Sequence, residues 1–438
     1  MPAPPAPAAK TLGLWNVAAL GVGSMVGAGV FALLGQVALL VRGETWLAFA
    51  AGGVVALFSG YSYARLGARY PSSGGIIDYF KLGLKSPLVA RSLSMLYLVT
   101  LALTIAMVAK AFGAYAARLF HEPPLHAERV DVYASGIVMA LTLLNVIGAA
   151  AVGRAELALV VVKLAILGLL IGVGVTTLKP AMLDFALPGR PGALLASVGL
   201  AFFAYAGYGM MANAAADVHD PARNMPRAFM LAIGVVIVLY VVLALVVLGN
   251  VSPADLARYA DTAVAEAAAP VLGHTGFVLV SVAALLATAS AINATLFSLI
   301  NIALALGKDG ALPPLFGRRL MGQGTWGLLI LIAIILVLTN FLNLDAIASV
   351  ASATFLASYL AVFVAAWRLR HEIHASAFLL ALGFLLMAAV FAAFLQSLLG
   401  AGRWVELGLL IGAGLLSWLL ARSGKPQAAA APSAAPPG

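Results

Sequence analysis

The segment Gly21–Phe31 reads GVGSMVGAGVF, and a second segment, Phe202–Met211, reads FFAYAGYGMM. Both place glycines inside an apolar run that otherwise predicts a helix, and a glycine in a helix interior costs about 1 kcal/mol relative to alanine. Interrupted helices at corresponding places in two halves of a chain are typical of membrane proteins that hold a ligand at the bilayer midplane. The alternative is that these small residues only allow close helix packing.

The composition predicts that lipid is the solvent of this chain. Of its 438 residues, 63% are hydrophobic and 9% are charged, whereas soluble domains are near a quarter charged. The absence of cysteine excludes disulfides and Cys-based zinc sites. The net charge of +9 is explained by basic loops between apolar runs, so we expect a lipid bilayer and no nucleic acid as partner. We expect neither a cofactor nor a metal site.

The apolar runs predict an all-α membrane protein, because a spanning helix needs roughly 20 predominantly apolar residues. We expect disordered cytoplasmic ends at 1–12 and 422–438, which are rich in Ala and Pro. About twelve helices are predicted, at 13–41, 46–68, 87–118, 131–150, 155–177, 193–217, 226–249, 275–306, 325–343, 346–367, 375–398 and 403–421.

The distribution of basic residues predicts the orientation. Most Lys and Arg fall in those connecting segments that lie inside if the N-terminus is cytoplasmic. We therefore expect both termini in the cytoplasm and the chain in a bacterial cytoplasmic (inner) membrane.

Several segments resemble one known family. Gly23–Phe31 is similar to the first-helix motif of the amino acid–polyamine–organocation transporters, and Arg65–Pro71 resembles their first cytoplasmic loop. Asp220–Ala228 matches the family's N-P-x-R-N-x-P-R-A stretch, and Lys308–Gly310 matches the loop after its eighth helix. The matches run in order over residues 12–320, so the set is more specific than any one motif.

The resemblance implies a LeuT-like fold of five plus five helices in an inverted repeat, with helices 1 and 6 broken, and transport by alternating access. The first repeat is then 13–177, the second is 193–370, and helices 11 and 12 occupy 375–421. The chain departs from the pattern at Ala28, where a Ser or Thr is common. It also has Gly209 where the acid-resistance antiporters of the family carry an acidic residue.

Broken helices supply partners for both charges of an amino acid without charged side chains. A half-helix that starts near Gly27 offers unpaired N–H groups and a positive dipole end, which suit a carboxylate. A half-helix that ends before the break in helix 6 offers carbonyls, which suit an ammonium. The resemblance points to the same positions. The predicted donors are Gly27, Ala28 and Gly29, and the predicted acceptors are Phe203, Ala204 and Ala206, with Met25.

Lys163 is predicted to couple protons to transport. It lies within LALVVVKLAILGLL, where a charge costs several kcal/mol and usually marks a pathway or relay. Snorkelling is the alternative, but the helix end at Arg154 is about 13 Å away at 1.5 Å per residue. The resemblance adds that proton-coupled members have a fifth-helix lysine where sodium binds in sodium-coupled relatives. We expect the Lys163 ammonium to reach carbonyls near Met25 and Val26, and Ser290.

Four further side chains are candidates for the cavity. Phe203 matches a residue that gates the substrate in the family, and Tyr208, Ser290 and Asn293 are predicted to line the cavity. Packing between helices, or interhelical hydrogen bonds, would equally explain these residues.

The predicted function is proton-coupled uptake of neutral L-amino acids. None of the acidic residues lies centrally in a predicted helix, and a carrier of cationic substrates would be expected to keep a carboxylate in its pocket. An amino-acid exchanger and an importer of polyamines or cationic amino acids remain alternatives. An enzyme is not expected, because no paired carboxylates or histidine cluster lie within the apolar runs.

Overall fold

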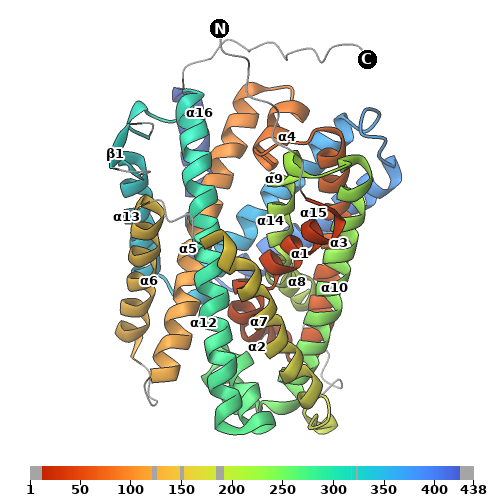
Figure 1. Ribbon diagram of the computed structural model, residues 1–438, viewed down its shortest axis with the longest axis vertical. Helices are drawn as coiled ribbons and strands as arrows, with labels where there is room; N and C mark the ends of the chain where they lie inside the picture. The colour runs from red at the N-terminus through yellow and green to blue at the C-terminus, as the bar shows by residue number, and fades with distance from the viewer. Residues whose placement is uncertain are drawn as a thin grey trace.

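The computed structural model describes residues 12–120, 126–147, 152–183, 192–316, 318–321 and 324–424. Helices make up almost all of these residues, and they run roughly side by side along the long axis of the molecule (Figure 1). The first half of the chain forms α1 Leu14–Met25, α2 Ala28–Val41, α3 Thr45–Arg69, α4 Ile76–Gly83, α5 Pro87–Phe120, α6 Ala127–Ile147 and α7 Val152–Gly174.

The second half continues the bundle. A 3-10 turn, η3 Ala206–Tyr208, follows α8, and another, η5 Ala260–Thr262, precedes α12. The helices are α8 Ala193–Tyr205, α9 Gly209–Asn213, α10 Pro221–Asn250, α11 Pro253–Arg258, α12 Ala263–Lys308, α13 Trp326–Phe341, α14 Leu344–Arg368, α15 Ala377–Gly400 and α16 Trp404–Ser423.

The all-α prediction is confirmed, and each of the twelve predicted spans is helical in the described residues. Nine helical runs in that part of the chain are long and apolar enough to cross a bilayer. Three shorter apolar helices, Leu14–Met25, Ala158–Gly174 and Trp326–Phe341, account for the remaining spans. The predicted disordered ends lie almost entirely outside the described residues. The inverted repeat stays a prediction.

Two local features differ from the sequence prediction. No strand was expected, but Arg319–Met321 and Gly324–Thr325 pair as a small antiparallel hairpin, β1 and β2, beside α13. In addition, α12 starts far before the predicted 275, and a kink at Gly273, with φ of 70°, separates its first turns from the spanning part. Only glycine adopts such a φ readily, so the kink lies where the sequence permits it.

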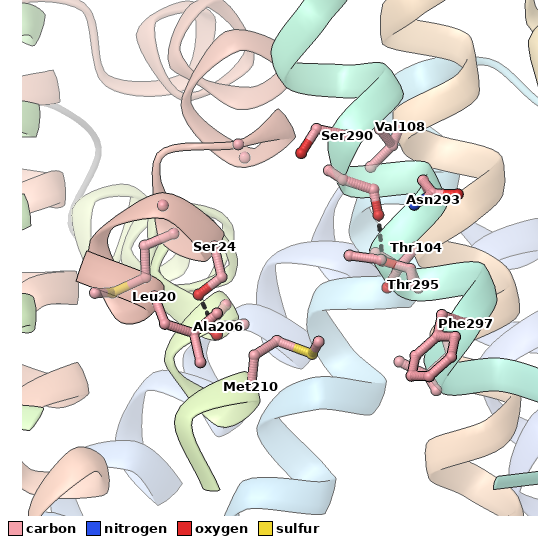
Figure 2. A pocket seen from close by; sticks show the side chains of 18 of the residues that line it. Leu20, Ser24, Thr104, Val108, Ala206, Met210, Ser290, Asn293, Thr295 and Phe297 are labelled. Atoms are coloured by element: carbon pink, nitrogen blue, oxygen red, sulfur yellow. Dashed lines mark hydrogen bonds between the residues drawn. The ribbon is translucent and has the colours of Figure 1, made fainter. Parts of the chain in front are cut away.

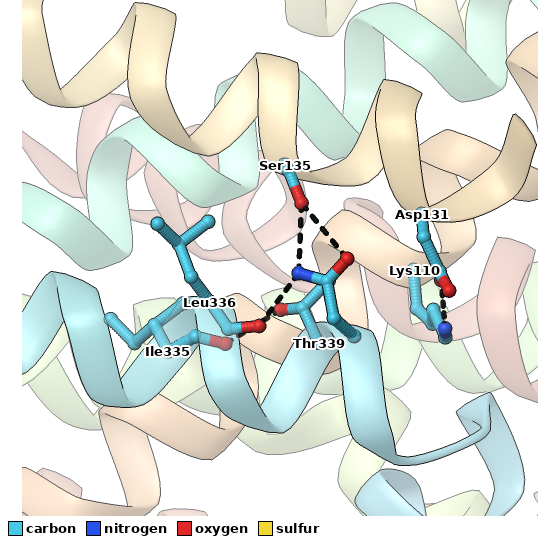
Figure 3. A network of polar contacts seen from close by, with 7 residues as sticks. Lys110, Asp131, Ser135, Ile335, Leu336 and Thr339 are labelled. Carbon is cyan, nitrogen blue, oxygen red and sulfur yellow. Dashed lines mark hydrogen bonds and ion pairs between the residues drawn. The ribbon is translucent and has the colours of Figure 1, made fainter. Parts of the chain in front are cut away.

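Lys110 on α5 lies inside the bundle. Its side chain is buried and forms an ion pair with Asp131 of α6 (Figure 3). Close by, the Asn340 Nδ2 atom of α13 donates to Ser135 Oγ of α6 at 2.9 Å. The ion pair satisfies a charge within the bundle, where an unpaired charge would be expensive, whereas the Asn340–Ser135 contact lies at an exposed face. They also join α5, α6 and α13 into one unit.

Candidate functional site

The first predicted helix, helix 1 at 13–41, is interrupted at its glycines, as the sequence predicted. The first half, α1, ends at Met25, and the second half, α2, begins at Ala28. Between them Val26 has φ −77° and ψ 56°, and Gly27 has φ −113° and ψ −129°, neither of which is helical. The Gly27 N–H donates to Met25 O at 2.7 Å, so this predicted carboxylate donor already has a partner.

The N–H groups that the break leaves for a ligand belong to the first turn of α2. Helix geometry gives the amides of Ala28, Gly29 and Val30 no partner within their own helix. The positive end of the helix dipole lies at the same place and favours an anion. This arrangement suits a carboxylate at Ala28 and Gly29.

Glycine lets the two interrupted helices touch at two points. A Cβ atom at Gly29 would lie 2.6 Å from Ala204 Cα, and one at Gly207 would lie 2.4 Å from Ser24 O. The Ser24 hydroxyl also donates to Gly207 O at 2.9 Å. The backbone of helix 1 therefore packs directly on the backbone of helix 6.

The interruption of helix 6 is milder than expected. The chain passes from α8 through η3 into α9 without leaving the right-handed helical region: Ala206 has φ −57° and ψ −16°, and Gly209 has φ −56° and ψ −27°. A 3-10 turn shifts hydrogen bonding from i→i−4 to i→i−3, and the Ala206 N–H bonds Phe203 O accordingly. The carbonyls are redirected rather than fully exposed.

Two buried tyrosines donate to the predicted acceptors. The Tyr240 hydroxyl of α10 lies 2.6 Å from Met25 O and 3.2 Å from Ala204 O, so it contacts the ends of α1 and α8 at once. The Tyr359 hydroxyl of α14 donates to Ala206 O at 2.8 Å. Neither residue was predicted from the sequence, where the available signal was a hydroxyl placed within an apolar helix. Met25 O also accepts the Gly27 N–H, and Ala206 O also accepts the Gly209 N–H. Both lone pairs of these two carbonyls are therefore engaged, and an ammonium would have to displace one of the donors.

A cavity of about 1020 Å³ lies between these helix ends and α5, α7 and α12. In Figure 2, Ser24 and Ala206 stand on one side, and Thr104, Ser290 and Asn293 stand on the other. Of the predicted site residues, the cavity is lined by Met25, Gly27, Gly29, Lys163, Phe203, Ala204, Ala206, Ser290 and Asn293.

Tyr208 is the predicted site residue that the structure places away from the cavity. The side chain of Ala28 lies outside the described part of the structure. Tyr208 is completely buried, with its ring 5.6 Å from that of Tyr63 and 5.5 Å from that of Tyr359. The 3-10 turn directs it away from helix 1 into this aromatic cluster, which corrects its predicted place. Phe203 does face the cavity and meets Phe355 edge to face at 5.2 Å.

Lys163 points to helix 1, as expected, but to an earlier carbonyl. Its side chain is 1% exposed, and its Nζ atom donates to Gly23 O at 2.7 Å. The predicted carbonyls were those near Met25 and Val26, so the contact lies earlier in α1 than expected, and a contact with Ser290 stays a prediction. The contact joins α7 to the last turn of α1, where carbonyls lose their intrahelical donors.

The opposite wall of the cavity carries polar side chains among apolar ones such as Val108 and Phe297, and no acid. Asn145 of α6 donates to Asn293 Oδ1 of α12 at 2.8 Å, and Thr104 of α5 lies nearby. Among the described residues that line the cavity, none is Asp or Glu. No group of three or more His, Cys, Asp or Glu in the described chain has metal-site geometry. The cavity is thus equipped for hydrogen bonding to a ligand.

The cavity is open at one end and closed at the other. It reaches Asn16 of α1 and Asn301 of α12, both exposed. Beyond the break, α2 is held by Gln36, whose Nε2 atom donates to Asp261 Oδ1 of η5 at 2.5 Å. A Cβ atom at Gly35 would lie 2.0 Å from Ala260 O, so the two segments are in close backbone contact. Access is therefore from the side where α1 begins.

Comparison with known proteins extends these observations. Residues 12–405 match the family model described as amino acid permease. The inner membrane transport protein YbaT of Escherichia coli K12 is 54% identical over 94% of this chain and 96% of its own. The methylthioribose transporter of Bacillus subtilis is 26% identical, covering 83% and 82% of the two chains, and the branched-chain amino acid permease BcaP of that organism is 24% identical, covering 69% and 68%.

Proposed function

The chain belongs to the amino acid permease family, and on that premise we propose that it takes up neutral L-amino acids by proton-coupled alternating access. Its role is membrane transport of amino acids or related substrates, since its relatives are named for transport rather than for catalysis. The finer assignments of substrate, coupling and orientation are our proposal.

One observation carries the proposal: helix ends and a buried lysine meet in a single cavity. The first turn of α2 would hold the substrate carboxylate, and carbonyls at Met25, Ala204 and Ala206 would hold its ammonium. Lys163 reaches Gly23 O at the edge of the same cavity. When charged, its ammonium ties α7 to α1. When neutral, that tie weakens, so proton binding favours one access state over the other.

A neutral substrate is supported by the lining. A substrate with a second positive charge would need a carboxylate partner, because an unpaired charge in a low-dielectric site is costly. The described lining offers Lys163 as its one formally charged side chain. This argues against the importer of polyamines or cationic amino acids. We place the chain in a bacterial inner membrane with cytoplasmic termini, so the open cavity faces inward.

The test is uptake by purified protein in proteoliposomes, after a thermal-shift screen of the common amino acids. We expect a neutral amino acid to accumulate when an inward proton gradient is imposed and to equilibrate when the gradient is collapsed. Counterflow that is indifferent to the gradient would instead identify an exchanger. Uptake inhibited only by arginine, lysine or polyamines would overturn the neutral substrate class.

A further inference from the structure

We propose that Asn293, held in place by Asn145, selects substrates whose side chains accept a hydrogen bond, namely neutral amino acids with a hydroxyl or carboxamide group. The inference rests on the proposed function, because it uses the helix ends as the site for the substrate's main-chain charges. It adds the chemical class of the side chain and the residue that recognises it.

The orientation of the substrate follows from the two walls of the cavity. If the α2 N-terminus and the η3 carbonyls hold the carboxylate and the ammonium, the side chain must extend away from them. Figure 2 shows Asn293 and Ser290 of α12 across the cavity from Ser24 and Ala206. The substrate side chain therefore meets the polar wall formed by α12 and α5.

The amide of Asn293 is fixed by its neighbour. Asn145 Nδ2 donates to Leu141 O at 2.8 Å on its own helix and to Asn293 Oδ1 at 2.8 Å. Because Oδ1 of Asn293 is thus engaged by α6, its Nδ2 group is the end that remains for a ligand. A carboxamide NH₂ is a donor only, so the complementary substrate atom is an acceptor.

Two threonine hydroxyls of this wall are committed to their own helices. Thr104 Oγ1 donates to Thr100 O at 2.7 Å, and Thr295 Oγ1 donates to Ala291 O at 2.7 Å. Their protons are therefore used, and Asn293 is left as the amide donor on this face. When the transporter closes around an aliphatic side chain, the Asn293 NH₂ group loses water without gaining a partner. Burying an unpaired donor costs free energy, so the site would discriminate strongly against aliphatic side chains.

The experiment is competition for uptake in proteoliposomes, with alanine as the labelled substrate. We expect serine, threonine, asparagine and glutamine to compete at least about tenfold better than valine or leucine. Asn293→Ala should lose most of this preference, measured as the ratio between competition by serine and competition by valine. Asn145→Ala, which leaves Asn293 in place but removes its support, should weaken the preference partially and keep the protein folded even if Asn293→Ala is unstable.

Asn301→Ala is the matched control, because Asn301 lines the exposed end of the same cavity. It should leave the preference unchanged. Equal competition by polar and aliphatic amino acids in the wild type, or an unchanged preference in both Asn293→Ala and Asn145→Ala, would overturn the inference. The proposed function would survive that result, since aliphatic amino acids would still be transported. If no amino acid were transported, the proposed function itself would fail.

Discussion

Gly29 is a residue of the site with little freedom to change. Its Cα faces Ala204 so closely that a Cβ atom would approach the Ala204 backbone to 2.6 Å. Backbone cannot rotate out of the way as a side chain can, so α2 and α8 would have to separate. Their separation would move the α2 N–H groups relative to the α8 carbonyls, which are the two halves of the proposed site.

We therefore predict that Gly29→Val abolishes transport. The added bulk should cost about 1–3 kcal/mol as overpacking, visible as a lower unfolding temperature in detergent. Gly168→Val on α7 is the control, because nothing lies within 4 Å of a Cβ atom at Gly168. It makes the same change within a helix and should leave uptake near the wild-type level. Normal uptake by Gly29→Val protein would refute the site.

Tyr240 affects the same site through one hydroxyl group. We predict that Tyr240→Phe raises KM several-fold with little change in kcat, because Met25 O and Ala204 O lose the donor that sets their spacing. Loss of one buried hydrogen bond typically costs about 1 kcal/mol. Tyr205→Phe is the matched control, since its ring packs against Tyr240 but its buried hydroxyl donates to Phe49 O of α3 at 2.9 Å and to neither Met25 O nor Ala204 O. Equal KM changes in the two variants would reduce Tyr240 to a packing role.

At the scale of elements, the glycine patterns predicted the positions of both interruptions but not their kinds. Helix 1 contains non-helical backbone at Val26 and Gly27, whereas helix 6 keeps helical dihedrals through η3. The glycine content indicates only that the backbone can depart from the α-helix at these positions. The departure itself is set by tertiary donors such as Tyr359, which lies far from Ala206 in sequence. For the same reason the sequence identified Lys163 but not its partner, Gly23.

The contact between α7 and α1 leads to a prediction on coupling. Lys163→Ala should lose accumulation driven by a pH gradient, while counterflow survives, because the ammonium that ties the two helices is removed but the helix ends remain. Lys110→Ala is the control: it also removes a buried lysine, but one paired with Asp131 of α6 and absent from the cavity lining. It should lower stability and keep pH-driven accumulation. Accumulation by Lys163→Ala at the wild-type level would make Lys163 structural and place coupling elsewhere.

At the scale of the whole molecule, the described state is closed on one side by a few contacts. Gln36 of α2 and Asp261 of η5 form the polar contact at 2.5 Å, and Gly35 lies against Ala260 beside it. Under the proposed alternating access, opening this side requires α2 to leave η5, so we expect the hydrogen bond in one access state only. A change that removes it should shift the population toward the other state by the free energy of that contact.

We predict that Gln36→Leu favours the state open on the η5 side. The chain has no cysteine. A single Val108→Cys therefore reports on access to the part of the cavity around Val108, whose side chain is 1% exposed in the described state. A membrane-impermeant thiol reagent added on the η5 side should label Val108→Cys several-fold faster in the Gln36→Leu background than without that substitution. A single Asn301→Cys in the same background should be labelled more slowly by reagent added on the opposite side. Ser135→Ala is the control, because it removes a polar contact between α6 and α13, away from α2. Ser135→Ala should change neither labelling rate. If Gln36→Leu also left both labelling rates unchanged, packing alone would hold α2 in the closed position.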